Sequence, residues 1–236
     1  MVNSCKYTAQ GLIMKNIVIF LGLLFSFSAI AEDDPGTSDQ SNETQIYQRL
    51  PTEISSKHAD QNNVIRFYYS YTCPYCKQVH QFIKAWGNSL PNGYSYIETP
   101  VIDNSNASKM LASAIKYVEN NSPSQYFVDR YNTNIYKNIH KISTTEQLSR
   151  LIKEAMGNSK VNYHDFLSSF EDEQFINSLE DDIEQQEDYS VHVTPTVVIG
   201  GKYVTHLGLA EGDTNRFIDI LNAVSNLHIQ SGGRIK

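Results

Sequence analysis

The chain has 236 residues, which is enough for one sizeable domain with an insertion or for two small domains. Its hydrophobic content of 40% is that of a soluble globular protein with a packed core. The formal net charge of −7, without a basic stripe, argues against nucleic acid or another phosphate-bearing partner.

The N-terminal segment has the composition of a secretory signal peptide. Lys15 precedes an apolar run from Ile17 to Ile30, and the small residues that a signal peptidase reads follow up to Ala31. This pattern predicts a signal peptide over residues 1–31, with residues 1–13 as an upstream extension. A membrane anchor is the alternative, but the run is shorter than the ~20 apolar residues of a spanning helix.

Removing this segment takes away one cysteine and two lysines, so the formal charge changes from −7 to −9. The two cysteines that remain are Cys73 and Cys76. Structural disulfides in exported proteins usually close loops of many residues, whereas this pair closes a very short loop. The pair therefore indicates redox reactivity, in preference to a structural crosslink.

The tetrapeptide Cys73-Pro74-Tyr75-Cys76 follows a β-branched and aromatic run, Val64–Tyr69, that predicts a buried strand. Apolar residues recur at helical spacing from Cys76 to Trp86, and Pro74 suits the first turn of a helix. A helix N-terminus presents unpaired N–H groups and a partial positive charge, which stabilise a thiolate at Cys73. Because the thiolate is the species that attacks disulfides, the tetrapeptide predicts a redox nucleophile.

The remaining chain predicts a strand, a helical block, a hairpin around Gly200-Gly201 and a last helix. Thr194 and Pro195 precede the hairpin. The expected elements are a strand over 94–102, helices over 107–120, 124–139, 144–156, 163–170 and 172–187, strands over 196–199 and 203–205, and a helix over 211–226.

This order of elements predicts an α/β thioredoxin fold with a helical insertion between the second core strand and the C-terminal β-hairpin. We expect residues 46–236 to form this domain, with the insertion at about 107–187, after a flexible polar leader over 32–45. In that fold Pro195 lies beside the cysteines. A proline there donates no N–H, and it leaves the backbone of Thr194 free to pair with an extended substrate chain.

Over roughly residues 46–226 the chain resembles the DsbA-type thiol:disulfide oxidoreductases of the bacterial envelope. The resemblance depends on the Cys73–Cys76 tetrapeptide after an aromatic strand, the run Leu90–Gly93, the helical insertion, and the segment from Thr194-Pro195 to Val204. It implies a periplasmic enzyme that transfers its Cys73–Cys76 disulfide to unfolded exported proteins with free cysteines. By the same resemblance, Cys73 is the attacking sulfur, Cys76 resolves the mixed disulfide and Pro195 is a cis-proline.

The resemblance also implies a DsbB-like membrane partner that restores the oxidised form. We expect no cofactor and no metal. A monomer is expected, because residues 32–63 are too few for the N-terminal dimerisation domain of known isomerases. Two other functions stay open: a disulfide isomerase or reductase of the same fold, and, from a different class, a metal-delivery or chaperone-like binding module.

The binding-module alternative depends on His80. Cys73, Cys76 and His80 stand at i, i+3 and i+7, so a regular helix places them near one face, as in a three-ligand copper or zinc site. The competing interpretation is a histidine on the helix surface that adjusts the pKa of the thiols.

The chain departs from the family pattern at three positions. Tyr75 stands where the family usually has a histidine, so we expect a less acidic Cys73 and a less oxidising disulfide than in the strongest oxidants. Phe67 stands where the family usually has a buried acid, so the family's proton relay lacks its usual residue there. Thr194, like Tyr75, is also familiar in isomerase and reductase relatives.

Overall fold

The computed structural model describes residues 45–232. The signal peptide expected over residues 1–31 lies outside the described residues, as does the leader expected over 32–45 apart from its last residue. Within the described part of the chain, no helix has the length and apolar character that crossing a membrane requires.

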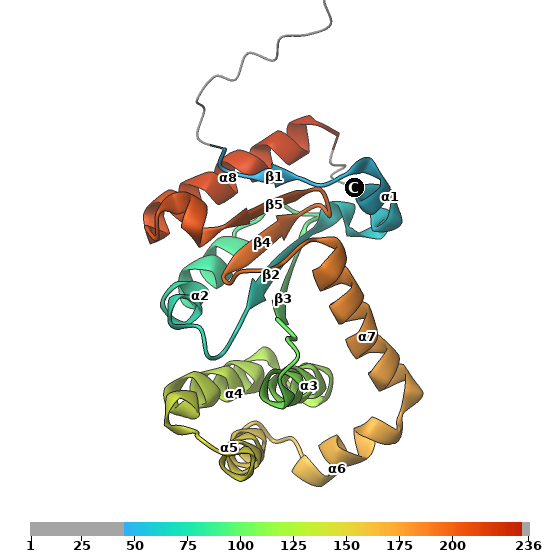
Figure 1. Ribbon diagram of the computed structural model, residues 1–236, viewed down its shortest axis with the longest axis vertical. Helices are drawn as coiled ribbons and strands as arrows, with labels where there is room; N and C mark the ends of the chain where they lie inside the picture. The colour runs from blue at the N-terminus through green and yellow to red at the C-terminus, as the bar shows by residue number, and fades with distance from the viewer. Residues whose placement is uncertain (1–44, 233–236) are drawn as a thin grey trace, which may run out of the picture. The chain divides into compact units, whose positions relative to one another are not determined.

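One five-stranded sheet forms the centre of the domain, with the strand order β1-β5-β4-β2-β3 (Figure 1). Strand β2 runs parallel to β3 and antiparallel to β4, and β5 pairs antiparallel with both β4 and β1. The strands are β1 (Gln48–Arg49), β2 (Val64–Tyr69), β3 (Ser95–Pro100), β4 (Thr196–Ile199) and β5 (Tyr203–His206).

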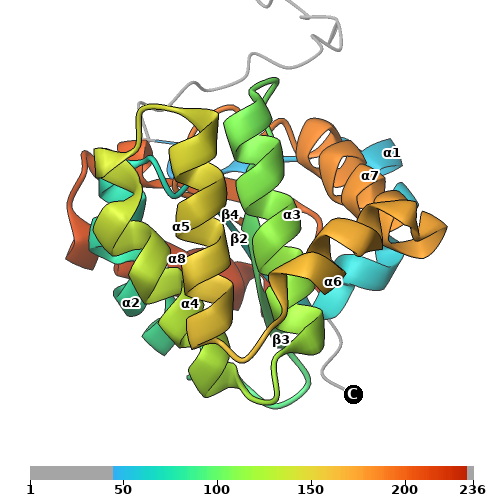
Figure 2. The same cartoon turned by 90° about the horizontal axis from the view of Figure 1, so that it is seen from below.

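Apart from the short α1, the α-helices of the described residues fall into two groups. α2 links the parallel strands and α8 follows the hairpin, whereas α3 to α7 all lie between β3 and β4 in the sequence. Figure 2 shows α3, α4 and α5 side by side in this insertion. The helices are α1 (Thr52–Lys57), α2 (Pro74–Gly87), α3 (Asn106–Asn121), α4 (Gln125–Asn138), α5 (Thr145–Asn158), α6 (Tyr163–Ser168), α7 (Glu173–Asp188) and α8 (Thr214–Gln230).

This topology confirms the predicted thioredoxin fold with a helical insertion before the C-terminal hairpin. Side chains of a strand alternate between the two faces of its sheet, and β2 is buried on both. Ile65, Phe67 and Tyr69 join the core formed by α2, α8 and the insertion, whereas Tyr68 packs against a second cluster around Tyr189. A central strand covered on both faces needs a largely apolar sequence, and β2 could be recognised because Arg66 is its one charged residue.

The main error lies at the last helix, which begins at Thr214 and not at Glu211 as expected. Glu211 has a left-handed backbone with φ of 56°, which ends a short 3-10 turn. Asp213 then caps α8, because its carboxylate accepts a hydrogen bond from the N–H of Arg216 at 2.8 Å. The short helix α1 was not predicted, since its six residues carry no clear apolar period.

Candidate active site

Cys73 is the N-cap residue of α2, so its sulfur lies where the first helical turn leaves N–H groups unpaired. The N–H of Cys76 donates to the Cys73 Sγ at 3.3 Å. Pro74 occupies the first turn, where its missing N–H costs no helical hydrogen bond. The tetrapeptide thus places the Cys73 sulfur at the N-terminus of α2.

Hydrogen bonds to its sulfur make the Cys73 thiol acidic. The pKa of Cys73 is lowered to about 5, chiefly by a hydrogen bond from the Cys76 thiol and further by the N–H groups of Cys76 and Tyr75. For comparison, the reactive cysteine has a pKa of ~3.5 in DsbA and ~7 in thioredoxin. Since Cys73 is only partly buried, it is a reachable thiolate at neutral pH.

Cys76 has the opposite character. Its side chain is 0% exposed, and its Sγ accepts a hydrogen bond from the N–H of Ser70 at 3.5 Å. The hydrogen bond to the Cys73 sulfur and the burial of the side chain raise the pKa of Cys76. At neutral pH the reduced pair therefore carries one negative charge, on the outer sulfur, and keeps one proton on the inner sulfur.

Thr194 lies directly against Cys73, with its carbonyl oxygen 3.4 Å from the Cys73 Sγ, which donates to it in the thiol form. The Thr194–Pro195 peptide bond is cis, and Pro195 is buried just before β4. Within residues 45–232 the N–H of Thr194 has no protein acceptor. An unpaired main-chain donor beside the thiolate is suited to bind an extended peptide.

A groove of about 380 Å³ begins at the same point and is lined by Tyr75, Thr194 and Pro195 together with the segment after β5. Two apolar side chains at its rim are exposed, Tyr75 at 56% and Val193 at 49%. Exposed apolar groups grouped beside a reactive atom are typical of an interaction site. The groove is therefore suited to bind apolar side chains.

Comparisons with known proteins agree with this geometry. A family model described as Thioredoxin matches residues 51–219. The thiol:disulfide interchange protein DsbA of Azotobacter vinelandii is 24% identical over 177 residues, which are 72% of this chain and 76% of that protein. The Pseudomonas aeruginosa DsbA structure has a TM-score of 0.65 at 17% identity, over 80% of this chain and 95% of that one. Proteus mirabilis DsbA, with a non-covalently bound peptide PWATCDS, has a TM-score of 0.57 at 16% identity, over 78% and 96% of the two chains.

The chain therefore belongs to the thioredoxin family. The resemblance predicted from the sequence is confirmed, and the chain is a DsbA-type thiol:disulfide oxidoreductase. The fold brings the candidate residues of α2 and those before β4 to one place, as the contact between Cys73 and Thr194 shows. The candidate residues are Cys73, Pro74, Tyr75, Cys76, Thr194 and Pro195.

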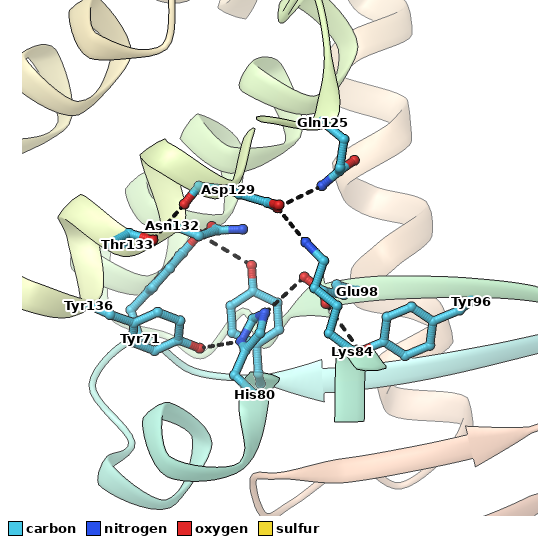
Figure 3. A network of polar contacts seen from close by, with 11 residues as sticks. Tyr71, His80, Lys84, Tyr96, Glu98, Gln125, Asp129, Asn132, Thr133 and Tyr136 are labelled. Atoms are coloured by element: carbon cyan, nitrogen blue, oxygen red, sulfur yellow. Dashed lines mark hydrogen bonds and ion pairs between the residues drawn. The ribbon is translucent and has the colours of Figure 1, made fainter. Parts of the chain in front are cut away.

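His80 shares a face of α2 with Cys76, as its spacing predicted, but that face is buried. It is 7% exposed and lies on the buried face of α2, so the expectation of a surface histidine is wrong. Its ring nitrogens contact Tyr136 and Glu98, each at 3.0 Å, and not the cysteines (Figure 3). In the described residues, no three His, Cys, Asp or Glu side chains are grouped as metal ligands.

The polar cluster around His80 escaped the sequence analysis. Tyr136 comes from α4 of the insertion and Glu98 from β3, so neither is near His80 in the sequence. The available signal was Glu98 itself, a single acid between the β-branched residues Ile97 and Thr99 of a strand. Phe67 is 0% exposed at the position where the family usually has an acid, and Glu98 is its register partner on the neighbouring strand.

Proposed function

We propose that this enzyme is a disulfide donor of the periplasm that oxidises exported proteins with free cysteines. The observation that supports this most directly is the lowered pKa of Cys73 at the N-terminus of α2. A stabilised thiolate makes the reduced form of the pair favourable, so the oxidised form tends to give its disulfide away.

The proposed exchange has two steps. A client thiolate attacks the Cys73 Sγ of the oxidised enzyme, a new client–Cys73 bond forms, and the Cys73–Cys76 bond breaks with its electron pair on Cys76, which takes up a proton. A second client thiolate then attacks the client sulfur of the mixed disulfide, and Cys73 leaves as the thiolate. The client gains one disulfide, and the enzyme gains the two electrons.

Client binding is proposed to be mostly backbone-mediated. Thr194 offers its N–H beside Cys73, and the groove at Tyr75 and Pro195 offers apolar contact. The peptide bound non-covalently to the Proteus mirabilis relative supports a polypeptide client for this enzyme. A DsbB-like membrane partner would then remove the two electrons, and the enzyme would act as a monomer.

The periplasmic location depends on the signal peptide expected over residues 1–31. Fusing residues 1–45 to alkaline phosphatase without its own leader tests it, because that enzyme is active only after export. Active fusion protein in the periplasmic fraction is expected. Inactive phosphatase retained in the cytoplasm would contradict the proposed location but not the chemistry.

The donor activity is tested with a reduced protein that contains two cysteines. The oxidised wild-type enzyme should convert it to the disulfide form in stoichiometric amount, and Cys73→Ser should not. Cys76→Ser has no disulfide to donate, so it should also leave the test protein reduced. When it is given the test protein in its disulfide form, the Cys73 thiolate should attack that disulfide and form a mixed disulfide, which accumulates on non-reducing gels because Cys76 is absent and cannot resolve it. A wild-type enzyme that leaves the test protein reduced would contradict the proposal.

A further inference from the structure

A buried polar cluster lies between α2 and α4, and the proposed exchange reaction as written does not use it (Figure 3). The Nε2 of His80 is 3.0 Å from a Glu98 oxygen, and its Nδ1 is 3.0 Å from the Tyr136 hydroxyl. The Tyr96 hydroxyl donates to the other Glu98 oxygen at 3.1 Å. The Tyr71 hydroxyl lies beside this cluster and donates to Asn132.

The pair at the centre of this cluster is nearly closed to solvent, with side-chain exposures of 9% for His80 and 10% for Glu98. Ionisable groups at such a depth are unfavourable unless they are paired, and pairing is what the two contacts supply. One opening remains, because a groove of about 640 Å³ between α2 and α4 is lined by His80, Asn132 and Tyr136. Protons can therefore be exchanged with water through this groove.

The cluster is close to the inner sulfur. His80 follows Cys76 by one helical turn on the buried face of α2, a spacing that sets the two Cβ atoms about 5–6 Å apart. Tyr136 lies within electrostatic reach of both Cys76 and Glu98. Burial raises the pKa of Tyr136, and the charges of these two residues raise it further. No hydrogen bond among the described residues joins the cluster to the Cys76 sulfur, and a general acid or base can act through one intervening water.

Other charged or titratable groups face the pair from each neighbouring element. Among them, the positive charge of Lys84 is neutralised by an ion pair with Asp129. The pKa values of Tyr69 and Tyr96 are raised by burial, so both keep their protons. Histidine is the side chain that exchanges protons near neutral pH. The groups are Lys84 on α2, Tyr69 on β2, Tyr96 on β3, Glu119 on α3 and Asp129 on α4.

We infer that the His80–Glu98 pair, acting through the Tyr136 hydroxyl and one water, is the proton donor and acceptor of the Cys76 sulfur. The inference rests on the proposed roles of Cys73 and Cys76 and adds the source of the proton. Protonated His80 donates to Glu98 through Nε2 and to Tyr136 through Nδ1. The Tyr136 hydroxyl is then free to donate onward.

The proton balance follows from this arrangement. When the Cys73–Cys76 bond breaks, the Cys76 thiolate takes the proton that the Tyr136 hydroxyl passes on, and Tyr136 receives the Nδ1 proton of His80. Neutral His80 still donates its Nε2–H to Glu98, and its Nδ1 accepts a hydrogen bond from the Tyr136 hydroxyl. A proton from water in the groove later restores the positive charge of His80. In the reverse direction the same path takes the proton from the Cys76 thiol before it attacks a mixed disulfide.

The test separates the two halves of that reverse reaction. Reduced enzyme is mixed with excess oxidised glutathione between pH 5 and 9, and acid quenching resolves formation of the Cys73–glutathione disulfide from its resolution by Cys76. Tyr136→Phe keeps the ring and removes the hydroxyl. We expect it to slow resolution at least about tenfold near pH 6, and to leave the rate of formation and the titration of Cys73 unchanged.

Glu98→Gln and His80→Phe should show the same selective loss, and Tyr136→Phe decides the matter if either of them fails to fold. Thr133→Val is the matched control, because it removes an uncharged hydroxyl that lines the same groove and donates to the Asp129 backbone carbonyl, outside the proton path. Tyr136→Phe with the wild-type resolution rate and pH profile would overturn this inference alone. A wild-type enzyme that forms no mixed disulfide would overturn the proposed exchange as well.

Discussion

Phe67 on β2 and Glu98 on β3 are register partners on adjacent parallel strands, so their side chains project from the same face of the sheet. The Phe67 and His80 ring centroids are 5.5 Å apart in an edge-to-face arrangement, and His80 contacts the Glu98 carboxylate. The chain thus has an apolar ring at the position where its relatives usually bury an acid, and a carboxylate on the next strand.

Replacing Glu98 by Leu should lower the free energy of unfolding by about 2 kcal/mol or more, because His80 and Tyr96 both lose a buried partner. Glu98→Gln should cost less, since its amide oxygen still accepts a hydrogen bond. Urea unfolding followed by circular dichroism measures both. Glu187→Gln, on an exposed part of α7, is the control and should change stability by less than about 0.5 kcal/mol. Equal stability of Glu98→Leu and wild type would contradict the structural role of the pair.

Titration of Cys73 should show a thiolate transition at about pH 5, followed by absorbance near 240 nm. Cys76→Ser should move this transition upward, because the hydrogen bond from the Cys76 thiol is the largest cause of the low pKa and a serine hydroxyl fits the sulfur less well. Cys73→Ser should abolish it. If the wild-type transition instead occurs near ~8.5, the value of an ordinary cysteine, the helix N-terminus does not activate Cys73.

The stability of the reduced enzyme should depend on pH between about 5 and 8. The pKa of Cys73 is depressed on folding, so its contribution is fully present above the unfolded thiol's pKa of ~8.5 and is lost as the pH falls to about 5. The pKa of Cys76 is raised, so its contribution is already complete below ~8.5 and stays constant in this window.

The unfolding free energies of the reduced and the oxidised enzyme are measured across this window. Their difference isolates the contribution of the thiols, because carboxylates and histidines contribute to the pH dependence of both forms. The excess stability of the reduced form should shrink steadily toward pH 5. A difference that does not vary with pH would show that folding leaves the Cys73 pKa unshifted.

Pro195→Ala should prolong the mixed disulfide with clients. The substitution adds an N–H next to Thr194, whose carbonyl contacts Cys73, and so gives the client backbone a further donor at the site. Non-reducing gels of cells that produce the variant should show more high-mass adducts than wild type. Pro51→Ala, at the exposed N-cap of α1, is the matched control. Adduct levels and turnover equal to wild type would remove Pro195 from the site.

The sequence allowed the fold to be predicted where the signal is local. The aromatic strand Val64–Tyr69, the tetrapeptide at the start of α2 and the Gly200-Gly201 turn each carry their own pattern, and the predicted bounds of β2 and β4 agree with the structure. His80 shows what could not be predicted from local sequence. Its helical face followed from its spacing, but what covers that face is Tyr136, which stands 56 residues later in the chain. Glu98 went unnoticed because one acid in a strand is usually on an exposed face.

Trp86 is the chain's single tryptophan, and it lies in the last turn of α2, the helix that begins at the reactive sulfur. The residue is 8% exposed, and its indole N–H donates to Asn222 of α8 at 2.8 Å. The protein therefore contains its own fluorophore at the far end of the helix that carries the redox pair. Its emission, free of any second indole, can report on the packing of that helix against α8 whenever the two sulfurs change state.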